Sequence, residues 1–136
     1  MLDATVRERM AASLHDGLAQ FIGTDGYHRL SPMHGKLVAT DGVKYLCEAA
    51  GAFWLIDAIA SHQPSALRDP SLREIQFWRL QVNADRSAVL EVARDDGDVA
   101  FRQQIEFTDF PLDEQKIWVA PGGPEETYVA MLPSEN

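Results

Sequence analysis

The sequence predicts an α+β domain in which an antiparallel sheet is covered on one face by helices. Two observations lead to this prediction. Hydrophobic residues in the first half of the chain recur with the 3.6-residue period of helices, whereas after Pro64 they alternate with polar residues as in half-buried strands. Short turn sequences separate the alternating segments, which favours hairpins over the long crossovers that parallel strands need.

Two helical regions are predicted in the first half. Residues 4–22 place their hydrophobic side chains within one arc of a helical wheel. Residues 41–62 form the second region, where Thr40 or Asp41 can accept the free amide hydrogens of the first turn. Within it, residues 52–60 are hydrophobic almost all round the wheel, which indicates a buried helix.

Four or five strands are predicted in about residues 75–132, joined as a meander and packed on the two helical regions. Residues 64–73 contain two prolines and are predicted to link the helical half to the sheet. Residues 27–39 are too irregular for a firm assignment, although two short segments there are compatible with strands. The inner faces of the main strands are expected to carry Trp78, Leu80 and Val82; Leu90 and Val92; Val99, Phe101, Ile105 and Phe107; Ile117 and Val119; and Tyr128, Ala130 and Leu132.

Length and cysteine content indicate the number of domains and the cellular compartment. The 136 residues fit a single domain, residues 1–136, with no internal repeat. Cys47 is the only cysteine, which excludes an internal disulfide and a thiolate zinc cluster within the chain and favours a reducing compartment. The N-terminus lacks the order of a signal peptide, and no uncharged hydrophobic run approaches the ~20 residues of a membrane span. A cytoplasmic protein without membrane contact is expected.

The formal net charge of −9 disfavours nucleic acid as a partner, because duplex binding depends on lysine and arginine at the phosphates. The acidity is compatible with a basic protein partner, and equally with a general requirement for solubility. Gly122 and Gly123 lack the strand-to-helix setting of a phosphate loop, so no nucleotide cofactor is expected. No metal ion is expected either, since the six-residue spacing of His28 and His34 is not that of a metal pair.

Asp57 and His62 are the two weak candidates for catalysis. Asp57 lies in the most hydrophobic helix, where a carboxylate without partners is costly. The structural interpretation is that it accepts hydrogen bonds from Ser61, a tryptophan N–H or a loop amide, and the functional one is a carboxyl group with a raised pKa. His62 stands at a helix C-terminus, where the helix dipole alone favours a protonated imidazole.

A second group of polar residues is a candidate interaction patch. Asp41, Lys44 and Glu48 follow one another along the helix predicted from residue 41. Helix capping by Asp41 and an ion pair between Lys44 and Glu48 explain them without a ligand. Cys47 shares the hydrophobic face of the same helix and is expected to be a small core residue, not a nucleophile.

Five stretches of the chain carry a resemblance to a known family. They are Phe21-Ile-Gly-Thr24, Thr40-Asp-Gly-Val-Lys-Tyr-Leu46, Gly51-Ala-Phe-Trp-Leu-Ile-Asp-Ala-Ile-Ala-Ser-His62, Phe107-Thr-Asp-Phe-Pro-Leu112 and Met131-Leu-Pro-Ser134. Together they resemble a family of short bacterial proteins, itself a domain of unknown function, often encoded on plasmids, integrated elements and phages. The resemblance covers roughly residues 18–136 and implies a mobile-element setting, but it brings no catalytic residue with it.

The expected function is therefore that of a non-enzymatic accessory protein acting through protein–protein contact, with a homodimer as one form of that contact. A more specific hypothesis is an inhibitor of a host-defence nuclease whose clustered acidic face stands in for phosphates. The alternative is a small hydrolase or transferase that uses Asp57 and His62 in a cleft between helices and sheet, with Asp41 or Lys44 as further groups.

Overall fold

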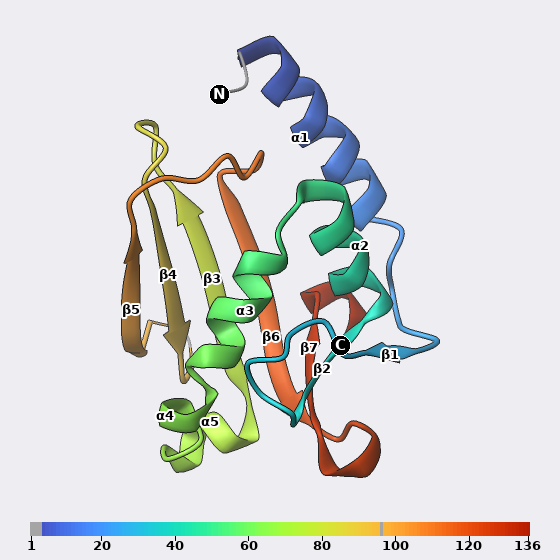
Figure 1. Cartoon of the computed structure of the whole chain (residues 1–136), viewed down its shortest axis with the longest axis vertical. Coiled ribbons are helices and arrows are strands. Elements are labelled where there is room, and N and C mark those ends of the chain that lie inside the picture. The colour runs from blue at the N-terminus through green and yellow to red at the C-terminus, as the bar shows by residue number, and fades with distance from the viewer. Residues whose placement is uncertain (1–3, 96) are drawn as a thin grey trace.

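The computed structural model describes residues 4–95 and 97–136, and the α+β class is confirmed within them. A mixed sheet of seven strands lies behind the helices, in the order β1-β2-β7-β6-β3-β4-β5 (Figure 1). The helices are α1 (Ala4–Leu18), α2 (Asp41–Ala50), α3 (Phe53–Ser61), α4 (Gln63–Ala66) and α5 (Pro70–Glu74), with short 3₁₀ turns at Pro124–Glu126 and Pro133–Glu135. The strands are β1 (Tyr27–His28), β2 (Leu37–Thr40), β3 (Gln76–Val82), β4 (Ala88–Ala93), β5 (Val99–Ile105), β6 (Glu114–Pro121) and β7 (Tyr128–Met131).

The expected four or five antiparallel strands are too few, because residues 27–40 add β1 and β2. β2 pairs with β7 in parallel, with Leu37 opposite Tyr128 and Ala39 opposite Ala130. Parallel pairing is possible here because helices and most of the sheet separate the two strands in the chain. All four residues of β2 are buried, so its sequence has no alternation that would have marked it as a strand.

The connection of β5 to β6 also departs from the predicted meander. β6 pairs with β3, not with β5, so residues 106–113 carry the chain back across the end of the sheet. Phe110 of this crossing segment is 1% exposed. The guanidinium of Arg86, in the β3–β4 turn, donates to the carbonyl oxygens of Thr108 and Phe110. The crossing is therefore anchored by burial and by a long-range contact that strand periodicity does not reveal.

The helical predictions hold with changed boundaries. The first helix ends at Leu18 instead of residue 22. After it, the Gln20 and Phe21 amides donate to carbonyl oxygens three residues earlier, as in a 3₁₀ turn. Residues 41–62 are mainly helical, as expected, but Gly51 separates α2 from α3 in a left-handed conformation with φ of 61°. Residues 64–73, predicted as a linker or short turn, lie mostly in the short helices α4 and α5.

The start of α2 is fixed by two side chains. The Thr40 hydroxyl accepts a hydrogen bond from the Val43 amide at 3.3 Å, as the sequence suggested. It also donates to the Glu135 carboxylate at 2.6 Å, which accepts the Gly42 amide hydrogen at 3.1 Å. A carboxylate at a helix N-terminus is favourable because the free amide hydrogens and the helix dipole are positive there. This contact ties the C-terminal segment to α2.

The core lies between the helices and one face of the sheet. Leu55, Ile56 and Ile59 of α3 are at most 1% exposed, and they belong to the same hydrophobic cluster as Trp78 and Leu80 of β3. The inner residues predicted for β3 and β4 are all buried. Phe101 and Ile105 of β5 are only half-buried, because β5 is the last strand of the sheet. Val99, expected on the inner face, lies on the opposite face, because the register shift between Val92 and Ala93 places it opposite Ala93, and Phe107 lies beyond the end of β5.

Candidate functional site

The helix-free face of the sheet has three rows of side chains that run across β6, β3, β4 and β5. Strand pairing places residues of adjacent strands opposite each other, and alternate residues point to the same face. The first row is hydrophobic, the second is charged and the third is mainly polar. In the strand order given, the rows are Trp118, Phe77, Ala93 and Val99; Lys116, Arg79, Glu91 and Arg102; and Glu114, Gln81, Val89 and Gln104.

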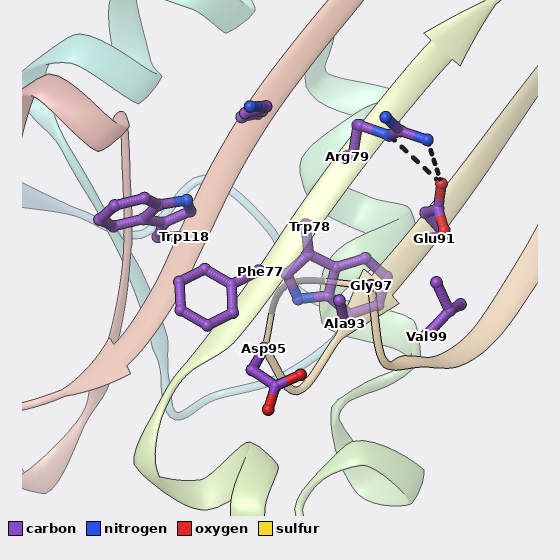
Figure 2. Close-up of a pocket in the computed structure, with 10 residues that line it drawn as sticks. Phe77, Trp78, Arg79, Glu91, Ala93, Asp95, Gly97, Val99 and Trp118 are labelled. Carbon is purple, nitrogen blue, oxygen red and sulfur yellow. Dashed lines mark hydrogen bonds and ion pairs between the residues drawn. The ribbon is translucent and has the colours of Figure 1, made fainter.

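The hydrophobic row forms the floor of a shallow hollow of about 450 Å³ (Figure 2). Phe77 and Trp118 meet edge to face, with ring centroids 5.3 Å apart and planes at 89°. Both rings are half-exposed although they point away from the core. The outer face of an antiparallel sheet is ordinarily polar, so a hollow with an aromatic floor is the main departure from a solvated surface.

The charged row consists of ion pairs across the strands. Glu91 is 8% exposed, and its carboxylate accepts from the Arg79 guanidinium at 2.7 Å and lies 3.6 Å from Arg102. Arg79 also lies 3.5 Å from Glu114, which is 3.9 Å from Lys116. These contacts neutralise the nearly buried Glu91 and hold the Arg79 side chain along one wall of the hollow. The acidic and basic groups alternate, so the charges on this face do not all have the same sign.

The turn between β4 and β5 closes the other side of the hollow. Gly97 of this turn adopts a φ of 83°, a conformation that favours glycine, and it lines the hollow together with Asp95. Figure 2 shows the Asp95 carboxylate beyond Phe77, on the side away from the pair of Arg79 and Glu91. The hollow therefore offers an aromatic floor between two polar walls, a combination suited to a protein side chain.

Asp57 lacks the hydrogen bonds that its structural interpretation requires. In the part of the chain that the structure describes, its Oδ1 atom is buried and has no hydrogen-bond partner. The Ser61 hydroxyl donates instead to the Ala58 carbonyl oxygen at 2.7 Å. The Trp78 indole N–H donates to Gln76 at 2.8 Å. The expected anchoring of helix to sheet by Asp57 is therefore not found.

His62 is held by the sheet. Its Nε2 atom lies 2.7 Å from Oε1 of Gln103 on β5, and its ring lies 5.0 Å from that of Phe101 between centroids. Asp57 and His62 are five residues apart, so on a helix their side chains diverge by about 140°. Helix geometry therefore does not bring the two side chains together, and neither residue lines the hollow of Figure 2.

The patch of Asp41, Lys44 and Glu48 is divided. Asp41 turns toward β1, where its Oδ1 lies 2.8 Å from Nε2 of His28 and its Oδ2 accepts the Asp25 amide hydrogen at 2.9 Å. The hydrogen bond from His28 and then that from Asp25 lower the pKa of the Asp41 carboxyl, against the opposing effect of desolvation. Within residues 4–95 and 97–136, the expected ion pair between Lys44 and Glu48 is not formed.

Cys47 is a core residue, as predicted. Its side chain is 1% exposed, and burial together with the nearby Asp57 and Glu48 charges raises the pKa of the thiol to about 12. The protonated thiol is a poor nucleophile and a poor metal ligand. Among the described residues, no three His, Cys, Asp or Glu side chains are arranged to hold a metal ion, and no helix is long and apolar enough to cross a membrane.

The aromatic pair was not among the candidates from the sequence. Phe77 and Trp118 each stand beside a core residue of their strand, Trp78 and Ile117, at positions where the alternation predicts a polar side chain. An aromatic residue in the polar phase of a strand was therefore the available signal. It is a weak signal alone, because only the pairing of β3 with β6 shows that the two rings touch.

Comparison with protein families confirms that the chain resembles a family of unknown function. The model of a family of unknown function, DUF6876, matches residues 12–136, and the chain belongs to that family. No curated protein and no solved structure is significantly similar to the chain.

Proposed function

We propose that this chain is a non-enzymatic accessory protein that acts by contact with another protein, and that the hollow on the helix-free face is its contact site. The observation that carries the proposal is the half-exposed pair of Phe77 and Trp118 on the only uncovered face of the sheet among the described residues. Tryptophan and arginine dominate the binding energy of protein interfaces, and here Trp118 and Arg79 line the same hollow.

The biological setting in this proposal is a bacterial mobile element, as the family resemblance implies. The version in which the protein mimics phosphates needs a clustered acidic face. The helix-free face does not supply one, since Arg79, Arg102 and Lys116 alternate with its carboxylates. The proposed contact therefore depends on a hydrophobic centre with a mixed polar rim, the usual composition of a protein interface.

The proposal is tested by affinity purification from lysate of a host cell, followed by quantitative mass spectrometry. The experiment compares wild type with a variant of the hollow and with a matched control variant. Trp118→Thr keeps a β-branched residue in the strand but removes the aromatic floor. We expect it to reduce recovery of the specific partner at least about tenfold, as for a central interface residue. Phe53→Gln removes another exposed aromatic side chain, on α3, and should retain the partner. Equal recovery with wild type and the folded Trp118→Thr variant would contradict the proposal.

The alternative of a small hydrolase or transferase rests on one observation, the buried Oδ1 atom of Asp57 without a partner. Because no hydrogen bond is lost, we expect Asp57→Asn to leave the free energy of unfolding unchanged or to raise it by up to about 1 kcal/mol. Thermal melts of wild type, Asp57→Asn and the surface control Asp16→Asn measure this. A loss of about 1–3 kcal/mol specific to Asp57→Asn would show that the carboxylate anchors the structure after all.

A further inference from the structure

Three of the four charged residues that line the hollow already have counter-charges within the sheet. Arg79 and Glu91 bind each other at 2.7 Å. Lys116 lies 3.9 Å from Glu114, on the same strand. The basic groups at the hollow are therefore balanced by neighbouring carboxylates and leave no uncompensated positive charge on the aromatic floor.

Asp95 is the fourth charged residue of the hollow, and its charge is not balanced. Its side chain is exposed and has no ion pair or hydrogen bond in the part of the chain that the structure describes. The adjacent Arg94 binds Asp69 at 2.6 Å and Asp98 at 3.1 Å instead. The Asp95 carboxylate therefore gives the hollow a negative charge on the side of Phe77 that faces away from Arg79 (Figure 2).

The two aromatic rings also favour a positively charged ligand. The face of an aromatic ring is electron-rich and attracts cations, and proteins bind alkylammonium groups with several such faces turned toward one point. The planes of Phe77 and Trp118 meet at 89°, so the rings form a corner and not a flat stack. A planar guanidinium stacks on a single ring face, whereas a compact ammonium fits a corner.

We propose that the hollow binds a lysine side chain of the partner protein, with the ammonium group against the two rings and its charge balanced by Asp95. The methylene groups of the lysine lie along the small hydrophobic residues of the same floor, Ala93 and Val99. The net charge of −9 favours the approach of a basic surface. This inference rests on the function proposed above, because it names the chemistry that the same site recognises.

Nuclear magnetic resonance with three peptides tests the choice of lysine. Each peptide has glycines around a central lysine, arginine or 6-hydroxynorleucine, in which a hydroxyl group replaces the ammonium. The Trp118 indole N–H signal, identified by its loss in Trp118→Thr, reports binding. We expect a millimolar dissociation constant for the lysine peptide, at least about fivefold below that of the hydroxyl peptide. Equal binding of these two, tighter binding of the arginine peptide, or no shift at about 20 mM lysine peptide overturns the proposal.

A charge variant with a matched control tests the role of Asp95. Asp95→Asn keeps the shape of the side chain and removes its charge, so we expect it to weaken binding of the lysine peptide about threefold and to leave the hydroxyl peptide unaffected. Asp16→Asn makes the same change of net charge on α1, where the side chain is 86% exposed, and should bind the lysine peptide as wild type does. Equal weakening in both variants would attribute the effect to net charge alone and contradict the proposal.

The affinity purification described above separates this inference from the proposed function. Asp95→Lys places an ammonium group of the chain itself beside the aromatic floor, so we expect recovery of the partner to fall at least about tenfold, with the fold intact by circular dichroism. If Trp118→Thr loses the partner and Asp95→Lys retains it, the lysine inference is wrong and the contact site stands. If both variants retain the partner, the proposed function itself fails.

Discussion

Replacing Gln76 with leucine is expected to lower the free energy of unfolding by about 2–4 kcal/mol, because it leaves two buried polar groups without partners. Gln76 is 0% exposed, and its side-chain amide exchanges two hydrogen bonds with that of Gln63, at 2.8 and 2.9 Å. Its Oε1 also accepts the indole N–H of Trp78 at 2.8 Å. The Gln76→Leu variant thus strands the Gln63 oxygen and the Trp78 N–H.

The partner variant and the double variant separate hydrogen bonding from packing. Gln63→Leu strands only the Gln76 amide N–H, because Gln76 Oε1 still accepts from Trp78, so its cost is expected to be smaller, about 1–3 kcal/mol. In the double variant only the Trp78 N–H lacks its partner, so its cost should be less than the sum of the two single variants. Chemical denaturation of the four proteins measures this. Additive costs would show that the two glutamines contribute independently.

Replacing Arg86 with alanine is expected to cost about 2–4 kcal/mol, because it removes the donors to two buried carbonyl groups. Arg86 is 9% exposed, and its guanidinium donates to the Thr108 and Phe110 carbonyl oxygens in the middle of the segment that crosses the sheet. Arg86 also adopts a φ of 70°, which is unfavourable for any side chain with a Cβ. Denaturation midpoints and hydrogen exchange of residues 106–113 measure the effect.

Arg86→Gly provides the control for backbone strain. It loses the same hydrogen bonds as Arg86→Ala, but glycine adopts a positive φ without steric strain. We therefore expect Arg86→Gly to be about 1 kcal/mol more stable than the alanine variant. The loss of exchange protection in residues 106–113 should be similar in both. Wild-type stability of either variant would mean that the guanidinium does not anchor the crossing segment.

The sequence by itself determined the class of the fold and most of its elements. The hydrophobic run of α3 and the two-residue alternation of β3 and β4 are local properties, and the structure confirms them with buried Leu55, Ile59, Trp78 and Leu90. The roles of Thr40 as a helix cap and of Cys47 as a core residue could also be predicted from the sequence. Each depends only on neighbours within one helical turn or on one face of an element.

Contacts between distant residues were decided only by the tertiary structure. The parallel pairing of β2 with β7 joins segments about 90 residues apart, and β2 is buried on both faces and so lacks alternation. The same holds for the candidate site. Asp57 was a candidate as a carboxyl group in a hydrophobic helix and His62 as an imidazole at a helix C-terminus, yet helix geometry turns their side chains apart. Phe77 and Trp118 lie far apart in the chain and touch because β6 returns to pair with β3. Periodicity indicates which face a side chain occupies, but strand order determines what lies beside it, and strand order arises from packing of the whole chain.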